Sequence, residues 1–120
     1  MTGKLLKIND YVVLLTNDDG WDAPGIVTIK NHLCVIGHPT VLAPQEPHSY
    51  CGHRVTTDVE LRLIQTGPDA YSLSGSPADC VRVGLRSLLA GHTVDWVISG
   101  INRGREPGGG HLYVGHGGGG

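Results

Sequence analysis

Residues 11–16 form a continuous apolar, partly β-branched run, a pattern typical of a strand buried on both faces of a parallel sheet. The run ends at Asn17-Asp18-Asp19-Gly20, a cluster of turn-forming residues. Pro24 suits the first turn of a helix, because its missing N–H has no partner to lose there. Apolar residues then recur at helical spacing and predict a helix that ends at Gly37. They are Ile26, Ile29, Leu33 and Ile36.

Shorter strand patterns follow this helix. Residues 40–43 predict a strand that Pro44 stops, and a polar loop from Gln45 to His53 comes next. Residues 54–64 and 70–74 predict β structure that is split by a turn at 66–69.

A second helix is predicted to begin at Pro77 and to end at Gly91. Its expected inner face consists of Val81, Leu85, Leu88 and Leu89. Residues 94–98 predict a last strand, which leads into the polar run 99–104. The order strand, helix, strand, hairpin, helix, strand indicates a layered α/β fold with a largely parallel sheet.

Three polar segments, 17–20, 44–53 and 99–104, follow predicted strands and should meet at the carboxyl edge of the sheet, where such folds bind ligands. The adjacent carboxylates Asp18 and Asp19 repel each other unless a cation lies between them. Mg²⁺ prefers one or two carboxylates together with neutral oxygens, which Ser49 and Asn102 could supply. The alternative is a simple solvated turn, with Ser49 and Asn102 as local backbone caps.

Composition narrows the function classes. An apolar fraction of 39% and a charged fraction of 17% fit a globular domain. A formal charge of −2 gives no reason to expect a nucleic acid polymer or an anionic membrane as partner. Residues 1–10 lack the apolar core of a signal peptide, and no run approaches the ~20 apolar residues of a membrane span, so we expect a cytoplasmic protein.

The cysteines and histidines carry weaker signals. The odd number of cysteines without CxxC spacing favours reduced thiols, with Cys34 and Cys80 in the core. His48, Cys51 and His53 share one short loop without a distant fourth ligand, which is poor evidence for zinc. Asp79, at the start of the second helix, is expected to cap N–H groups. Trp21 could face a nucleobase, although packing is the alternative.

Four segments together resemble the motifs of the SurE (survival protein E) nucleotidases. The first is 15–20 followed by Ala-Pro-Gly at 23–25, and the second is Ala43-Pro44 with Ser49 and Gly52-His53. The third, Gly-Ser-Pro-Ala-Asp-Cys-Val at 75–81, has serine where the family has threonine. The fourth is Ser-Gly-Ile-Asn-Arg-Gly at 99–104. Order and spacing agree over residues 12–104.

The resemblance implies a Rossmann-like three-layer fold and a phosphatase that uses one Mg²⁺ or Mn²⁺ to release phosphate from nucleoside 5′- or 3′-monophosphates. It places the metal on Asp18, Asp19, Ser49 and Asn102. It also implies that Asp18 orients or deprotonates the attacking water, with Asn17 beside it at the phosphate. Gly52 and His53 are candidate substrate contacts, and a structural loop histidine is the alternative for His53. The family assembles as homo-oligomers.

After Gly104 the resemblance breaks, so we divide the chain into an extension (1–10), a SurE-like domain (11–104) and a glycine-rich tail (105–120). The family continues with a Gly-Asn-Leu-Gly segment and a Ser-Gly-Thr phosphate loop. Written in GC-rich codons and read out of frame, Gly-Gly-Asn-Leu-Gly gives Arg-Glu-Pro-Gly, the sequence of 105–108. Ser-Gly-Thr-Val-Ala-Ala-Ala read out of frame gives Gly-His followed by four glycines, the sequence of 115–120. The tail is thus interpreted as frameshifted; a natural flexible tail is the alternative.

This departure affects function. Family members are about twice as long, and their second half completes the sheet and the oligomer interface. A chain without that half and without the phosphate loop is truncated relative to the family. The alternative to an active phosphatase is therefore a catalytically incomplete metal- or nucleotide-binding fragment.

Sequencing the gene tests the frameshift. We expect an alternative reading frame downstream of the Gly104 codon that encodes Asn-Leu-Gly and Ser-Gly-Thr-Val. A gene whose other frames lack both segments would show that the glycine-rich tail is natural.

Overall fold

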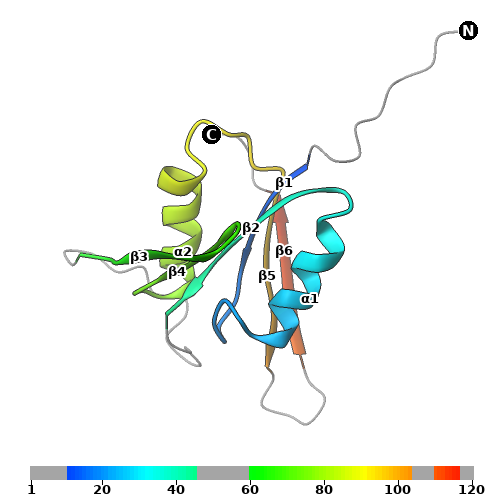
Figure 1. The fold of residues 1–120 in the computed structure, drawn as a ribbon, viewed down its shortest axis with the longest axis horizontal. Coiled ribbons are helices and arrows are strands. Elements are labelled where there is room, and N and C mark those ends of the chain that lie inside the picture. The colour runs from blue at the N-terminus through cyan, green and yellow to red at the C-terminus, as the bar shows by residue number, and fades with distance from the viewer. Residues whose placement is uncertain (1–10, 46–59, 104–109, 117–120) are drawn as a thin grey trace, which may run out of the picture.

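The computed structural model describes residues 11–45, 60–103 and 110–116, which form a six-stranded sheet with helices on both faces (Figure 1). In chain order the elements are β1 (Tyr11–Thr16), α1 (Pro24–Leu33), β2 (Gly37–Pro44), β3 (Leu63–Gly67), β4 (Ala70–Leu73), α2 (Pro77–Val83), the π-helical η1 (Gly84–Leu88), β5 (Trp96–Arg103) and β6 (Gly110–His116). The strand order is β3-β4-β2-β1-β5-β6. The four inner strands are parallel, and both edge strands run antiparallel to their neighbours, so the predicted α/β class is confirmed.

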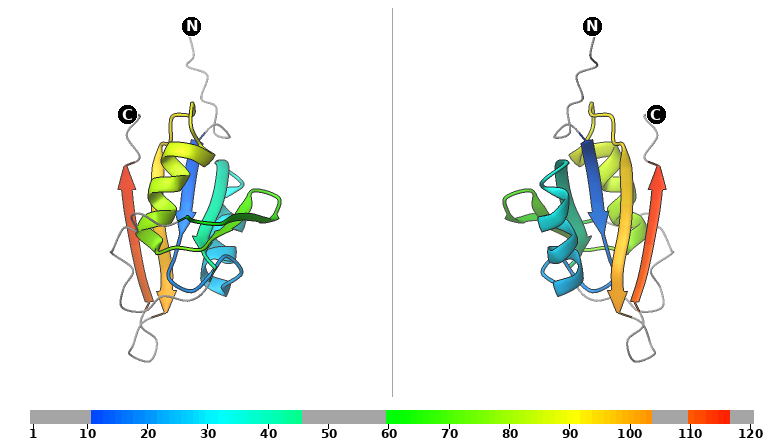
Figure 2. Two further views of the ribbon diagram at one scale, coloured as in Figure 1. Left: turned by 90° about the vertical axis from the view of Figure 1, so that its left-hand side faces the viewer. Right: turned by 90° about the vertical axis from the view of Figure 1, so that its right-hand side faces the viewer.

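Strand β1 lies between the two helical layers, as its unbroken apolar run predicts. Val13 and Leu15 pack with Ile26 of α1 on one face of the sheet. Leu14 packs on the other face with Cys80 of α2. The side views place α1 on one side of the strands and α2 with η1 on the other (Figure 2). The sheet is therefore the middle layer of three, as expected of a Rossmann-like fold.

Helix α1 begins at Pro24 as predicted but ends at Leu33, and Gly37 is the first residue of β2 rather than a helix stop. A Cβ atom at position 37 would collide with the Tyr11 carbonyl oxygen, so glycine lets β2 approach β1. From Gly37 onward the backbone pairs with β1 as a strand, so the helix cannot continue to this residue. Ile36, expected on the inner helix face, is consequently exposed.

The hairpin lies later in the chain than predicted, since 60–62 are not strand and 66–67 belong to β3 rather than to the turn, whereas the second helix begins where expected. Strands β3 and β4 are joined at Pro68-Asp69, inside the predicted turn, and Asp69 has a left-handed φ of 56°. Residues 60–62 precede the strand, and 54–59 lie outside the described residues. Helix α2 begins at Pro77 and continues through η1 to Leu88. Leu85, Leu88 and Leu89 pack against the core as predicted, whereas Val81 is only partly buried and not part of that cluster.

Strand β5 is longer than predicted, and the expected tail contributes a strand. The predicted 94–98 strand is Trp96–Arg103 in the structure, because β6 pairs with it from Trp96↔His116 to Arg103↔Gly110. Glycine is a poor strand former, so its abundance concealed β6 in the sequence. Among the described helices, none is long and apolar enough to cross a membrane.

Helix η1 approaches β1 closely at Gly84, which generates a stability prediction. A Cβ at position 84 would lie 2.7 Å from Leu14 Cδ2 and 2.9 Å from Cδ1, both fully buried. We expect Gly84→Ala to lower the free energy of unfolding in urea by about 1–3 kcal/mol, because the methyl group overpacks this contact.

The matched control for this substitution is Gly67→Ala. There the added Cβ would meet only Ala70 Cβ at 4.0 Å, so little change is expected. Equal stability of the two variants would show that Gly84 and Leu14 are not in close contact.

Candidate active site

The Asn17–Gly20 loop lies at the carboxyl edge of the sheet and follows β1, which ends before its two neighbours. Thr16, the last residue of β1, is level with Ser99 of β5, and Leu15 is level with Val41 of β2. Strand β5 continues four residues past Ser99, about 13 Å at ~3.3 Å per residue, and β2 continues to Pro44. The carboxyl ends of β1, β2 and β5 therefore lie at one edge of the sheet, the lower end in Figure 2.

Asn17 fixes the shape of this loop. Its side chain is fully buried, Nδ2 donates to the Gly20 carbonyl oxygen at 2.8 Å, and Oδ1 accepts from the Gly20 N–H at 3.0 Å. Gly20 has a φ of 112°, a conformation that side chains disfavour. These two hydrogen bonds fix the shape of the loop that carries Asp18 and Asp19. This is a positioning role, and the expected catalytic and phosphate-binding roles of Asn17 stay predictions.

Asp18 and Asp19 are the acidic pair of the loop, and both are partly buried. Two neighbouring carboxylates with restricted access to water favour a bound cation that offsets their repulsion. Trp21, which follows Gly20, packs against the cluster on the α1 face, in agreement with the packing alternative. Trp21 therefore anchors the end of the loop on the α1 face of the sheet.

The other expected metal ligands are only partly located. The backbone of Asn102 lies in β5, three residues beyond the position level with Thr16, after a bulge at Gly100 (φ 133°). Ser49, Gly52 and His53 lie outside the described residues, as do His48 and Cys51. The structure thus brings the Asp18-Asp19 loop and the backbone of position 102 to one edge. The ligand roles of Ser49 and Asn102 stay predictions.

Carboxylate chemistry favours a hard cation over a soft one here. Within the ranges that the structure describes, no three His, Cys, Asp or Glu side chains gather into a potential metal cluster. The candidate site therefore offers two carboxylates and depends on neutral oxygens for the rest, which is the donor set of Mg²⁺ or Mn²⁺.

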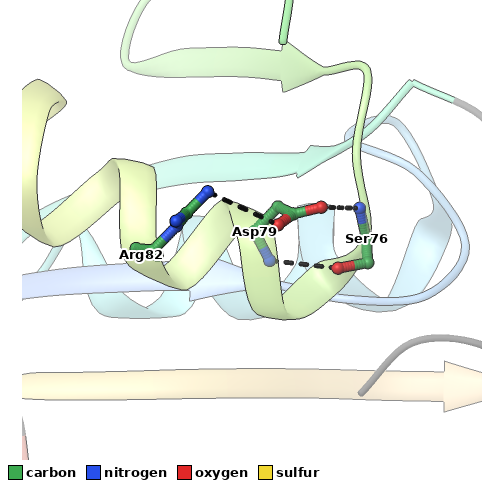
Figure 3. Close-up of polar contacts among 3 residues, drawn as sticks. All are labelled: Ser76, Asp79 and Arg82. Atoms are coloured by element: carbon green, nitrogen blue, oxygen red, sulfur yellow. Dashed lines mark hydrogen bonds and ion pairs between the residues drawn. The ribbon is translucent and has the colours of Figure 1, made fainter. Parts of the chain in front are cut away.

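Asp79 caps helix α2, as expected (Figure 3). Its backbone N–H donates to Ser76 Oγ at 3.1 Å, and its Oδ2 accepts from the Ser76 N–H at 2.9 Å, which forms a capping box. Oδ1 also lies 3.9 Å from Arg82 Nη2. A Cβ at Gly75 would lie 2.8 Å from Asp79 Oδ2, so this glycine makes room for the carboxylate. Asp79 is fully buried and acts in structure rather than in chemistry.

A buried contact between Thr16 and Cys80 joins the end of β1 to α2, and sequence reasoning missed it. Thr16 is 1% exposed and Cys80 0% exposed. Burial raises the pKa of Cys80 to about 12, the neighbouring Thr16 hydroxyl lowers this pKa in part, and the charge of Asp79 raises it further. The alternation of β1 places Leu14 and Thr16 on one face, and this was the available signal. Cys34, expected in the core, is instead exposed, because α1 ends before it.

These features define the class: a Rossmann-like α/β domain with an acidic loop at the carboxyl end of a central parallel strand. The family model of survival protein SurE matches residues 13–119. The chain therefore belongs to the SurE family.

Similar proteins agree with this assignment. The chain is 45% identical over 94 residues to the 5′-nucleotidase SurE of Wolinella succinogenes, covering 77% of this chain and 36% of that protein. It is 41% identical over 103 residues to the 5′-nucleotidase SurE of Geobacter sulfurreducens, covering 86% and 39%. A crystal structure of the SurE protein from Aquifex aeolicus has a TM-score of 0.73 at 39% identity, covering 78% of this chain and 38% of that one. The chain thus spans about two fifths of the length of the relatives it matches.

The two described cysteines should differ sharply in reactivity. At pH 8 we expect iodoacetamide to alkylate exposed Cys34 in the native protein, while buried Cys80, protonated because its pKa is raised, stays unmodified. Mass spectrometry of the peptides that contain each cysteine measures both. In denaturant both should react. Alkylation of native Cys80 at the rate of Cys34 would contradict the packing of α2 on β1.

Proposed function

We propose that the chain is the metal-binding part of a divalent-metal-dependent phosphatase that hydrolyses nucleoside monophosphates to nucleoside and phosphate. The observation that carries the proposal is the pair Asp18 and Asp19 on a loop that Asn17 closes at the carboxyl edge of the sheet. The relatives named 5′-nucleotidase SurE support the substrate class. The proposed substrate is a small nucleotide in the cytoplasm rather than a nucleic acid polymer or a membrane, since the formal charge is −2.

The donor set fits Mg²⁺ or Mn²⁺. Asp18 and Asp19 would hold the ion from one side, and Ser49 and Asn102 would complete its protein ligands. When bound, the cation supplies charge that polarises phosphoryl oxygens and lowers the pKa of a bound water. Without a cation, the two carboxylates would repel the phosphate dianion.

The other steps of the proposed reaction are assigned to residues of the chain. Asp18 orients the attacking water and accepts its proton, a role that requires a carboxylate at the edge of the site. Asn17 holds the loop that carries Asp18 in its shape, and a role in positioning the phosphate is also proposed for it. Gly52 and His53 are proposed substrate contacts in the segment after β2.

The second candidate function is metal or nucleotide binding without turnover. It is favoured by the sequence after Gly104, which lacks the Ser-Gly-Thr phosphate loop that the family resemblance leads us to expect. Assembly as a homo-oligomer is also proposed from the family. The chain spans 36–41% of the length of SurE relatives.

A phosphate-release assay tests the proposed activity. The full chain is incubated with Mg²⁺ or Mn²⁺ and a panel of nucleoside 5′- and 3′-monophosphates, beside Asp18→Asn and the matched control Asp22→Asn. Asp22 is exposed and belongs to the turn that follows the acidic loop. We expect metal-dependent release that Asp18→Asn lowers roughly 10²–10⁴-fold, since a general base contributes about that much, and that Asp22→Asn leaves unchanged.

The other outcomes separate the two candidates. Equal rates for wild type and Asp18→Asn would attribute the release to a contaminating phosphatase and contradict the proposal. Binding of Mn²⁺ that needs Asp18, without any phosphate release, would select the non-catalytic fragment.

A further inference from the structure

The Thr16 hydroxyl stands out among the buried polar groups near the acidic loop. Its Oγ1 is buried and, among the described residues, lacks a conventional hydrogen-bond partner. Its polar neighbour is the Cys80 thiol, a weak hydrogen-bonding group. Leaving a buried hydroxyl so poorly paired is costly, so a native protein that keeps one requires a reason for it, such as a bound ion or a role at the site.

The position of Thr16 identifies what the hydroxyl serves. Thr16 is the last residue of β1 and lies two residues before Asp18. Residues 17–20 form a turn directly after the strand, so the alternation of β1 ends at Thr16, and Asp18 is the second residue of that turn. Ser99 of β5 pairs with Thr16 and is partly exposed. The buried Thr16 hydroxyl is therefore on the strand next to a partly exposed residue. The carboxylate nearest to it in the chain is that of Asp18.

The neighbouring thiol leaves the threonine hydrogen available. Cys80 is fully buried and stays protonated at neutral pH, because burial raises its pKa. Its S–H can donate to a lone pair of Thr16 Oγ1, and the Thr16 O–H then remains free to donate elsewhere. A carboxylate that holds a metal ion commonly accepts such a hydrogen bond, which fixes its orientation.

We propose that Thr16 is a positioning residue whose hydroxyl donates a hydrogen bond to the Asp18 carboxylate when the site holds its divalent cation. Threonine at this position would then orient the ligand oxygen without touching metal or substrate. The proposal rests on the proposed function, because it takes Asp18 as a metal ligand.

Binding of Mn²⁺ alone, followed by the electron paramagnetic resonance signal of the free ion, tests this role without any turnover. The full-length variants are Thr16→Val, which replaces the hydroxyl by a methyl group of similar size, and Thr16→Ser, which keeps it. We expect Thr16→Val to weaken Mn²⁺ binding by about tenfold or more, as loss of such outer hydrogen bonds does. Thr16→Ser should stay within about threefold of wild type, and metal-free Thr16→Val should be at least as stable to urea as wild type, because the poorly paired hydroxyl is gone.

The variant Asp18→Asn distinguishes a failure of the Thr16 proposal from a failure of the proposed metal site. Wild-type Mn²⁺ affinity in Thr16→Val, with binding lost in Asp18→Asn, would overturn the role of Thr16 and leave the metal site intact. Wild-type affinity in Asp18→Asn would overturn the metal site itself.

A purely structural role for Thr16 would also overturn the proposal. It would appear as equal weakening in Thr16→Val and Thr16→Ser, or as weakening in proportion to lost metal-free stability. If Thr16→Val does not fold, Thr16→Ala takes its place in the comparison with Thr16→Ser.

Discussion

Two negative charges are held side by side at the carboxyl edge of the sheet by the hydrogen bonds between Asn17 and Gly20. This arrangement depends on β1 ending at Thr16 while β2 and β5 continue on either side. The central strand of the parallel sheet therefore sets the position of the acidic pair. Two neighbouring carboxylates at the carboxyl edge of such a sheet are suited to a cation.

The layers on both faces keep this edge in place. Leu14 and Leu15 point to opposite faces of β1 and are fully buried, one against the α2 side and the other against the α1 side. The start of β1 is held as well, since the Val12 N–H donates to Asp95 Oδ2 at 2.8 Å. Packing on both faces thus fixes the strand from which the acidic loop starts.

Much of the fold could be predicted from local signals. The apolar run of β1, the prolines at 24 and 77 and the turn at Pro68-Asp69 each specify backbone geometry by themselves. The end of α1 and the length of β5 could not be predicted, because pairing with a distant strand decides them. In the site, Asp18, Asp19 and the Asp79 cap were readable from residue type and position. The Thr16–Cys80 contact was not, since it requires knowing how α2 packs on β1.

Anomalous X-ray diffraction from crystals grown with Mn²⁺ tests the central claim most directly. The expected result is one strong anomalous peak in contact with carboxylate oxygens of both Asp18 and Asp19, with the side chain of Asn102 in the same coordination sphere. A peak elsewhere, or a structure in which these two carboxylates diverge and bind no ion at millimolar Mn²⁺, would contradict it.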